Sequence, residues 1–373
     1  MCDALGIIIS SSIRGRVKGI QDYRPLGAFS FMGRYRVIDF PLSNFSNSDI
    51  DHIQVYVREN PRSLAEHLSN ASSFDINSKK GKLQLLFSEK NELNDIYNTD
   101  IAAFEENINI IKRSRQQYVI VVPSYMIYKQ DFSQLVQEHI DSGADVSVLY
   151  QHVNNAKEAF INCNTVELNK QKGVLSISRN SGTANSRNIL LDTAIMSKEV
   201  FLDLIDKAHK LSAMCTLGMI ISEQAKAGEL DIRGIAHRGY VATVTDLRSY
   251  LEANLNLLDP ETSESLFTPD WPIYTVTTDA PPTRYIGDGD AVNSVVSNGC
   301  TIKGHVENCV IGRGVTIEEG AVVRNSVVLA YSRIGKDVSI DYQVIDKWAQ
   351  IRNAKQLIGS KENPGYIKRD DIL

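Results

Sequence analysis

The first apolar run of the chain is followed by serines and cations where glycines would be expected. Leu5–Ile9 is typical of a short buried strand, and three serines come directly after it: Ser10, Ser11 and Ser12. In many nucleotide-binding α/β folds this strand-to-helix loop is rich in glycine, because backbone N–H groups must approach phosphates closely. Here the loop keeps three positive charges, on Arg14, Arg16 and Lys18. We interpret it as a phosphate loop without its closest-approach residues, with a solvated basic loop as the alternative.

Length and composition limit the class of protein. The chain has 373 residues, which predicts two domains, and its 43% hydrophobic and 23% charged content is ordinary for a globular protein. A net charge of −5 gives no electrostatic reason to expect a nucleic acid as partner. The five cysteines show no metal-ligand spacing and favour a reducing, cytoplasmic location. Neither a membrane-length apolar run nor a signal-type N-terminus is present, so we expect no membrane partner.

The first 250 residues alternate strand-like and helix-like segments. The expected strands are Leu5–Ser10, His52–Val57, Tyr118–Pro123 and Asp145–Tyr150. The expected helices are Arg62–Ser69, Ile101–Arg113 and Phe132–Ser142. This alternation predicts an α/β domain with a mostly parallel sheet and helices on both of its faces. Ligands of such sheets bind at the carboxyl ends of the strands, so the segments Ser10–Arg16 and Pro123–Met126 would lie at the site.

The sequence pattern changes after about residue 290. Apolar residues recur every six positions at Ile311, Ile317, Val323 and Leu329, and the rhythm continues at Ile334 and Ile340 after a slip of one residue. A sustained period of six is typical of a parallel β-helix, in which each hexad forms one side of a coil. We therefore expect an α/β domain over residues 1–255, a connector over 256–290 and a β-helix over 291–373.

Four segments resemble a known family: Arg34–Asn44, Ile127–Phe132, Asp270–Tyr285 and Asn293–Ile302. They read RYRVIDFPLSN, IYKQDF, DWPIYTVTTDAPPTRY and NSVVSNGCTI. They are similar to bacterial glucose-1-phosphate adenylyltransferase, also called ADP-glucose pyrophosphorylase, and the resemblance covers nearly the whole chain in order. It implies a nucleotidyltransferase-like α/β domain followed by a left-handed parallel β-helix. It also implies a tetramer that makes ADP-glucose from ATP and glucose 1-phosphate, with Mg²⁺, for glycogen.

The chain departs from this family at the positions that hold its substrates. The family's phosphate loop, Gly-Gly-Arg-Gly-Thr-Arg, falls on residues 11–16, where Ser11 and Ser12 replace the two glycines. The lysine of a following Lys-Pro pair falls on Leu26. The family's two metal-binding aspartates and its sugar-phosphate lysine fall on Tyr125, Thr243 and, within a residue or two, Asn180.

These substitutions remove the groups that phosphoryl chemistry needs. Catalysis of such a transfer rests on positioning and on charge neutralisation by metal and lysine. Mg²⁺ prefers carboxylate oxygens, which neither Tyr125 nor Thr243 supplies. We therefore expect no catalytic residue, no metal and no other cofactor in this chain, with Mg²⁺ bound by a catalytic partner. The resemblance implies a D-type regulatory subunit, joined to a catalytic glucose-1-phosphate adenylyltransferase subunit in a heterotetramer.

Some basic residues are candidates for binding an anion. By analogy with a basic residue at the first of these positions in the family, Arg34 and Arg36 are candidates for an anionic effector site, and pairing with Asp39 or solvent is the alternative. Arg14 and Arg16 are candidates for residual phosphate binding. Two other functions stay open: an active adenylyltransferase that uses substituted groups, and a scaffold or binding protein outside glycogen metabolism. Activity of the purified chain tests the first, and a complex with an active homologue tests the second.

Overall fold

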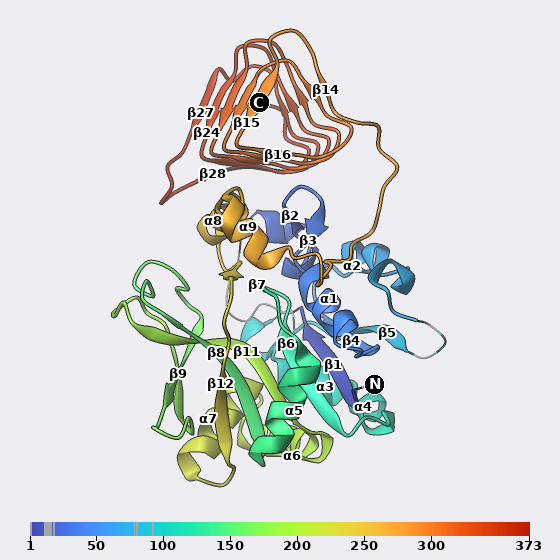
Figure 1. Ribbon diagram of the computed structural model, residues 1–373, viewed down its shortest axis with the longest axis vertical. Helices are drawn as coiled ribbons and strands as arrows, with labels where there is room; N and C mark the ends of the chain where they lie inside the picture. Colours follow the sequence, from blue (N-terminus) through green and yellow to red (C-terminus); the bar gives the residue numbers. More distant parts are fainter. Residues whose placement is uncertain (1, 11–16, 18, 78, 80, 92) are drawn as a thin grey trace.

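The computed structural model describes residues 2–373 apart from 11–16, 18, 78, 80 and 92. An α/β domain and a β-helix follow one another along the long axis of the molecule (Figure 1). The predicted site residues Ser11, Ser12, Arg14 and Arg16 lie outside the described residues, so the interpretation of their loop stays a prediction.

The described residues of the α/β domain form a nine-stranded sheet with the order β10-β9-β11-β6-β1-β4-β5, to which β8 and β12 are added through β11. The strands are β1 Ala4–Ile9, β4 His52–Val57, β5 Lys82–Phe87, β6 Tyr118–Pro123, β8 Val146–Val153, β9 Asn164–Leu168, β10 Val174–Arg179, β11 Arg187–Ser197 and β12 Ile232–Ala236. β1 is parallel to β4 and β6, and β4 is parallel to β5, whereas β11 is antiparallel to β6. Three of the predicted strands, β1, β4 and β6, lie in this parallel part, whereas the fourth, β8, pairs antiparallel with β11. β5 was not predicted.

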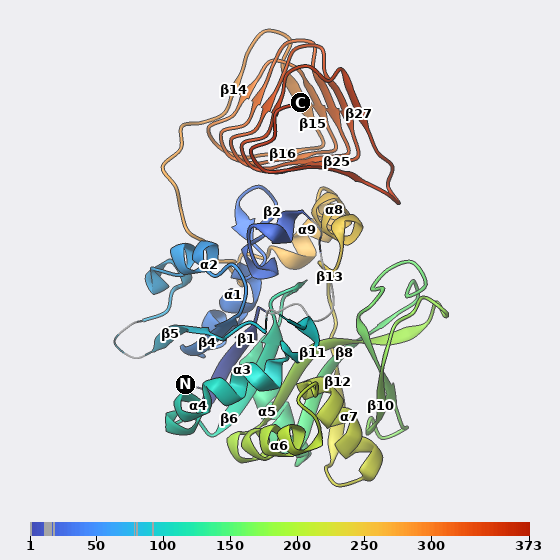
Figure 2. The same cartoon turned by 180° about the vertical axis from the view of Figure 1, so that it is seen from behind.

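Helices cover both faces of this sheet (Figure 2). They are α1 Asp39–Asn47, α2 Arg62–His67, α3 Asp100–Glu106, α4 Ile108–Arg113, α5 Phe132–Ser142, α6 Lys198–Leu211, α7 Leu217–Ala227, α8 Leu247–Asn256 and α9 Pro260–Leu266. One buried cluster joins Ile7 of β1 to Phe104 and Phe201, and the other joins Ile8 to Phe132. Neighbouring strand residues point to opposite faces, which explains this division. In the described part of the chain, no helix is long and apolar enough to cross a membrane.

Short elements complete the α/β domain. Four 3-10 helices are η1 Ile20–Asp22, η2 Leu26–Ala28, η3 Ala71–Phe74 and η4 Asp95–Tyr97. β2 Ser30–Phe31 pairs with β3 Tyr35–Arg36. β7 Met126–Tyr128 pairs antiparallel with β13 Val241–Thr243, and this second pair lies beside the candidate site.

Most predicted elements are present, and one is divided. β4, β6 and α5 have the predicted bounds, and in α5 Asp131 caps the first turn while Gly143 closes the helix at a φ of 66°. β1, β8 and α2 differ from the predicted bounds by up to three residues. The prediction of a single helix over 101–113 is wrong, because the chain breaks into α3 and α4 at Asn107. The Asn107 side chain donates to Ala103 O at 3.0 Å, a local bond that competes with helix continuation.

After residue 283 the chain forms three parallel sheets of five strands each. The first holds β14 Arg284–Tyr285, β17 Thr301–Ile302, β20 Thr316–Ile317, β23 Arg333–Ile334 and β26 Gln350–Ile351. The second holds β15 Asp290–Val292, β18 His305–Glu307, β21 Val322–Arg324, β24 Ser339–Asp341 and β27 Gln356–Ile358. The third holds β16 Val295–Val296, β19 Val310–Ile311, β22 Val327–Val328, β25 Gln343–Ile345 and β28 Gly365–Ile367. These sheets are the sides of the predicted left-handed parallel β-helix.

The apolar rhythm of the β-helix differs from the prediction at one position. Ile311 pairs with Val328 in the next coil, a spacing of 17 residues and therefore one short of three hexads. The prediction that Leu329 continues the interior column is wrong, because the five-residue step falls between Val323 and Val328. Leu329 is buried in the cluster that joins the β-helix to the α/β domain.

The segment expected as a connector contains regular structure. α9 occupies its first part, and β14 and β15 already pair with β17 and β18 of the next coil. The first coil therefore begins before residue 291. Its apolar side chains Tyr285, Ile286 and Val292 are exposed, because β14 and β15 are edge strands of their sheets.

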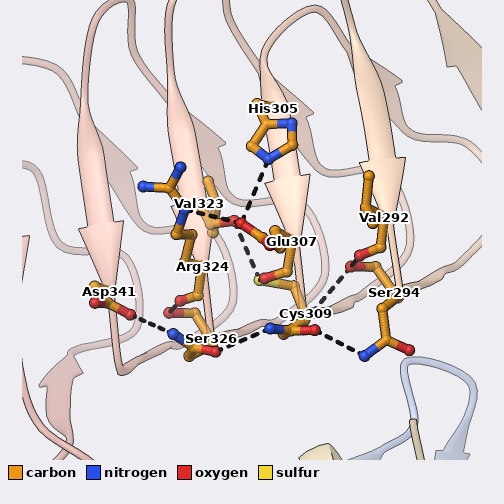
Figure 3. Close-up of polar contacts among 12 residues, drawn as sticks. Val292, Ser294, His305, Glu307, Cys309, Val323, Arg324, Ser326 and Asp341 are labelled. Atoms are coloured by element: carbon orange, nitrogen blue, oxygen red, sulfur yellow. Dashed lines mark hydrogen bonds and ion pairs between the residues drawn. The ribbon is translucent and has the colours of Figure 1, made fainter. Parts of the chain in front are cut away.

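One corner of the β-helix carries a row of side-chain hydrogen bonds that ends at Asp341 (Figure 3), and asparagines form it. Asn293, Asn308 and Asn325 have φ values of 45°, 53° and 46°, in the left-handed region that asparagine tolerates. Asn293 Nδ2 donates to Asn308 Oδ1 at 2.7 Å, and Asn325 Nδ2 donates to Asp341 Oδ1 at 2.9 Å. This row satisfies polar groups at the turn, so we assign these residues a structural role.

The β-helix packs on the α/β domain through the sheet that contains β16 and β28 (Figures 1 and 2). Val310, Val327 and Val344 of this sheet belong to the larger buried cluster of the α/β domain. Gly33 has a φ of 65°, and a Cβ added there would lie 2.9 Å from Ile311 O in the β-helix. The two domains therefore share a core and approach each other as closely as glycine allows.

Candidate functional site

A small cavity lies at the carboxyl ends of β1 and β6, where the sheet was expected to bind its ligand. Ile9 and Pro123 end these strands and line the cavity together with Leu26, Tyr125 and Asp192. Its volume is about 70 Å³, well below the roughly 300–1,000 Å³ of small-molecule sites. Most of the remaining lining is apolar and comes from β8, β10, β11 and α7. Side chains therefore fill much of the cleft in this structure.

Tyr125 closes one wall of this cavity. The side chain is 7% exposed, and its hydroxyl donates a hydrogen bond to the Asp192 carboxylate. Asn164 Nδ2 donates to the other carboxylate oxygen at 3.0 Å. Asp192 has a φ of 47° and lies where β11 shifts register between Leu190 and Ala194. The irregular strand thus aims a carboxylate at the position where the resemblance implies a metal-binding aspartate, and a phenol occupies that position.

Thr243 lies beside Tyr125, as the resemblance implies. It pairs with Met126 across β13 and β7, and Val244 N–H donates to Tyr125 O at 2.8 Å. The two side chains nevertheless face different spaces. Tyr125 lines the small cavity, whereas Thr243 lines a second one of about 240 Å³ along α8. Neighbouring backbones thus bring the two positions together without directing both side chains into one site.

Asn180 has a structural role in this fold. It is 3% exposed, and its Nδ2 donates to the carbonyl oxygens of Ala156 at 2.8 Å and Phe160 at 3.0 Å. Its Oδ1 accepts from Gly182 N–H at 3.1 Å. Both ends of the amide are engaged in holding the loop that precedes β9, and the residue does not line the small cavity. The structure therefore separates Asn180 from Tyr125 and Leu26.

Leu26 and its neighbours form an apolar floor under the cleft. Leu26 begins η2, is 3% exposed and lines the small cavity. A Cβ on Gly27 would lie 3.2 Å from both Ser10 Oγ and Ser124 Cβ, so this turn lies tightly against the end of β1. Ser10 is buried, and its Oγ has no hydrogen-bond partner among the described residues. A buried leucine in place of a lysine leaves the floor uncharged.

The described residues do not fit the magnesium site that the resemblance implies. Tyr125 and Thr243 offer no carboxylate, and the described chain contains no group of three or more His, Cys, Asp or Glu side chains placed to hold a metal. Two carboxylates, Asp100 and Asp192, line the cavity. Asp100 Oδ1 already accepts from the N–H groups of Ile101 at 2.9 Å and Leu217 at 3.1 Å. Hard oxygen ligands are therefore few and already in use.

Arg34 and Arg36 lie at the boundary with the β-helix. Arg36 is partly buried, which lowers the pKa of its guanidinium, and it donates to a backbone carbonyl of α2. Arg34 is exposed and lies 5.6 Å from the ring centre of Tyr35. Asp39 accepts the Arg36 backbone N–H at 2.8 Å and contacts His67 Nε2 at 2.5 Å. Among the contacts of the described residues, neither guanidinium pairs with Asp39.

The same boundary holds three basic residues that the sequence reasoning missed: Arg24, Arg313 and Lys347. Arg24 Nη2 donates to both carboxylate oxygens of Asp346, at 2.7 and 2.9 Å, and both side chains are almost fully buried. Burial lowers the pKa of Lys347 to about 8, and the charges of Arg24 and Arg36 act in the same direction. Arg24 and Asp346 are 322 residues apart, so no local pattern identifies them.

Comparisons with known families match both parts of the chain. Residues 16–160 match the Nucleotidyl transferase family, and residues 281–364 match the family described as GlmU-like, C-terminal hexapeptide. The first match begins after β1, covers β4, β5, β6 and β8, and ends in the loop that precedes β9. The second covers the β-helix except for its last residues.

Curated relatives match over longer spans. The glycogen biosynthesis protein GlgD of Bacillus subtilis (strain 168) is 27% identical over 367 residues, which are 98% of this chain and 95% of that protein. GlgD of Geobacillus stearothermophilus is 29% identical over 86% of this chain and 82% of its own length. A glucose-1-phosphate adenylyltransferase of Bacillus cereus (strain Q1) is 29% identical over 85% of each chain. The similarity therefore extends across both domains.

Proposed function

From this confirmed resemblance to GlgD proteins and glucose-1-phosphate adenylyltransferases, we propose that the chain is a regulatory, non-catalytic subunit in glycogen biosynthesis. The observation that carries the proposal is the hydrogen bond from Tyr125 to Asp192, which closes the cleft at an implied metal position. Asn180 supports it, because its amide holds a loop and presents no positive charge to a substrate. The uncharged floor at Leu26 supports it as well.

The reaction that the resemblance implies needs positive charge in the cleft. A phosphate oxygen of glucose 1-phosphate attacks the α-phosphorus of ATP, and pyrophosphate leaves with the electrons of the broken P–O bond. Loss of one stabilising group typically lowers such a rate about 10²–10³-fold. In this chain Asp192 adds a carboxylate to the cleft wall, and neither Tyr125 nor Thr243 offers a metal ligand. Several losses in one site act as a unit and leave little catalysis.

We infer that the partner is a catalytic glucose-1-phosphate adenylyltransferase subunit, in a cytoplasmic heterotetramer. The GlgD relatives match both domains of this chain, so the shared sequence includes the interdomain contact. A subunit without chemistry of its own can act by biasing a partner's equilibrium between two conformations. A coupling of about 1–3 kcal/mol would change the partner's apparent affinities about 5–150-fold.

We propose further that Arg34 and Arg36 contribute to an anionic effector site at the domain boundary. Lys347, Arg313 and Arg24 each lie close enough to Arg34 or Arg36 to interact with its charge. Like charges held together lower stability unless an anion balances them. This cost supports a role in binding, and Lys347 offers the clearest test of it.

The test uses the full chain and a catalytic homologue from the same source. Pyrophosphate release is measured with ATP, glucose 1-phosphate and Mg²⁺ for each protein alone and for their mixture, and the mass of the mixed species is determined in parallel. We expect no turnover from this chain alone, a mixed oligomer, and a changed ATP or effector dependence of the partner. The unfolded chain serves as the control. Unchanged partner kinetics at saturating amounts of this chain, with no mixed species, would refute the regulatory role and favour a scaffold outside glycogen metabolism.

A second candidate is an active adenylyltransferase with substituted groups. The observation that favours it is that Asp100 and Asp192 both line the small cavity and could supply carboxylate oxygens. Under this reading the chain alone would turn over at a rate near the enzyme median of about 10 s⁻¹. Asp192→Asn would then abolish that activity, whereas under the regulatory proposal there is no activity for it to remove.

A further inference from the structure

A groove opens at the amino end of the parallel strands, at the opposite end of these strands from the small cavity. It has a volume of about 460 Å³. β1, β4 and β5 contribute residues from their beginnings, and the chain that leaves α4 forms the other wall. Figure 1 places α4 close to the N-terminus, away from the β-helix. The lining residues are Leu5, His52, Ile53, Gln54, Lys82, Gln84, Ile110, Arg113, Ser114, Arg115 and Gln116.

The charge of this groove is positive. Lys82, Arg113 and Arg115 are exposed, and none of them forms an ion pair or side-chain hydrogen bond with another described residue. No aspartate or glutamate belongs to the described lining. The nearest carboxylate in sequence, Asp51, contacts His52 Nδ1 at 3.1 Å. Three cations therefore face one space without a counter-charge from the described chain.

A further positive charge covers the end of α4. The last carbonyl groups of a helix carry partial negative charge, which would repel an anion. Lys198 Nζ donates to Ser114 O at 2.7 Å, directly after α4 ends. This contact offsets the carbonyl charge at the wall of the groove.

Gln54 is a buried polar side chain directed into the groove. It is 2% exposed and lines the groove from β4. Its Oε1 accepts the Tyr56 hydroxyl at 2.8 Å, which fixes the orientation of the amide. Its Nε2 donates to no described residue. Nε2 is not among the fully enclosed side-chain atoms that lack a partner in the described chain, so it reaches the space of the groove and can donate to a ligand there.

We propose that this groove binds a phosphorylated small molecule. Arginine guanidinium groups match phosphate oxygens in pairs, and Lys82 adds a third charge at the opposite wall. Gln54 Nε2 donates to a second oxygen of the ligand. Leu5, Ile53 and Ile110 supply an apolar floor for an uncharged part of the molecule.

The shape and the charge distribution favour a small ligand over a macromolecule. A volume of about 460 Å³ is within the roughly 300–1,000 Å³ of small-molecule sites. The chain as a whole carries a net charge of −5, so its surface offers no extended basic field for a nucleic acid or a long acidic segment. The site is also separate from the small cavity and from the domain boundary, since it shares no lining residue with the former.

The test is calorimetric titration of the full chain with three phosphate probes: inorganic phosphate, glucose 6-phosphate and AMP. We expect at least one probe to bind, and the double variant Arg113→Gln with Arg115→Gln to weaken it about tenfold or more, because hydrogen bonds between charged partners are among the stronger ones. Gln54→Glu keeps the shape and the Tyr56 contact while adding a negative charge, and it should weaken binding further. The matched control is Arg333→Gln with Lys355→Gln, which removes two exposed charges from the β-helix.

The outcomes separate the sources of binding. Equal affinity for inorganic phosphate and for the organic phosphates would assign the site to the phosphate group alone, and tighter binding of glucose 6-phosphate or AMP would assign a role to the apolar floor. Absence of binding by all three probes, or binding that the arginine double variant leaves unchanged, would refute the proposal. Polyglutamate is titrated separately. Binding of polyglutamate without binding of any phosphate probe would replace the proposal with a docking site for an acidic peptide. None of these results depends on a catalytic partner, so they are independent of the proposed function.

Discussion

The cleft of the α/β domain and the boundary between the two domains differ in how their polar groups are used. At the boundary, buried Arg24 donates twice to buried Asp346, which also accepts the Tyr366 hydroxyl at 2.9 Å and the Lys347 N–H at 2.7 Å. In the cleft, the Tyr125 hydroxyl donates to the Asp192 carboxylate, and both side chains line the cavity of about 70 Å³. The boundary is built from contacts between distant parts of the chain, whereas the cleft is closed by its own lining.

The boundary and the cleft have different structural requirements. A boundary that holds two domains together needs complementary partners, and its tight positions, such as Gly33, admit little change. A cleft that holds substrates needs charge and open space, and this chain supplies little of either at the described positions. We infer that the molecule depends on this boundary for its folded state, whereas Tyr125 and Asp192 occupy part of the cleft.

The largest expected effect is at the boundary. Asp346→Ala leaves the buried Arg24 guanidinium without its counter-charge, so we expect the free energy of unfolding to fall by about 3–5 kcal/mol. Urea denaturation at neutral pH measures it. The control is Asp370→Ala, which removes a pair with Arg369 at the surface and should cost less than about 1 kcal/mol. Equal effects of the two variants would show that the buried pair does not hold the boundary together.

Acid should destabilise the α/β domain through His237. This histidine is 6% exposed, its Nδ1 lies 2.9 Å from Gln130 Oε1, and burial lowers its pKa from 6.5 to about 4. Between these values the unfolded chain binds a proton that the folded chain does not, so stability is complete above pH 6.5 and is lost as pH falls through 4. A difference of about 2.5 pH units corresponds to roughly 3 kcal/mol.

His237→Leu isolates this contribution from the carboxylates that also titrate in acid. Urea denaturation is repeated at several pH values between 4 and 7 for the native chain and the variant. We expect the free energy of unfolding to fall more steeply with acid for the native chain than for His237→Leu. The difference in slope should correspond to close to one bound proton. Parallel curves for the two proteins would assign the acid loss to other groups.

The sequence predicts the fold where a signal is local. A period of six identifies the β-helix because buried apolar residues such as Ile311, Ile317 and Val323 recur at that spacing. Asp131 and Gly143 mark the two ends of α5. The prediction fails at Leu329, because the one-residue slip in this coil cannot be placed from apolar character alone when Val328 and Leu329 are both apolar. The prolines of residues 260–290 favoured a connector, so the beginning of the first coil before residue 291 was missed.

The candidate site is predictable only in part for the same reason. Motif resemblance brings Tyr125 and Thr243 together correctly, since both lie next to recognisable segments. Asn180 belongs to a divergent stretch, and its role in holding a loop depends on carbonyl positions that no motif records. Arg24 and Asp346 meet only because the β-helix folds back onto the first domain. Contacts of this kind require the three-dimensional structure.

Lys347 offers a test at the boundary with an expected effect of roughly 3 kcal/mol, by the same conversion as for His237. Burial lowers its pKa from 10.5 to about 8, so the folded chain loses this proton at a lower pH than the unfolded chain. Stability should therefore rise with pH between about 8 and 10.5. This window is alkaline, whereas the window of His237 is acidic. Lys347→Met should be more stable than the native chain at pH 7, because it removes a partly buried charge beside Arg24 and Arg36.

The same variant tests the effector proposal. If the basic boundary binds an anion, added phosphate should raise the melting temperature of the native chain more than that of Lys347→Met. Potassium chloride at equal ionic strength is the control for general screening. An identical shift for both proteins would remove Lys347 from any anion site.

The smallest expected effect is the most informative about the cleft. Tyr125→Asp with Thr243→Asp returns the two carboxylates that the resemblance implies for metal binding, yet we expect no measurable release of pyrophosphate. The two side chains line different cavities, so the new carboxylates would not converge on one ion. Asp192 would then lie beside a second carboxylate without the Tyr125 hydroxyl, and like charges raise each other's pKa and favour protonation. Leu26 and Asn180 would still leave the substrates without positive charge. If this double variant were nearly as active as a catalytic homologue, loss of the metal ligands alone would explain the inactivity of the cleft. The difference between the cleft and the boundary would then depend on Tyr125 and Thr243 only.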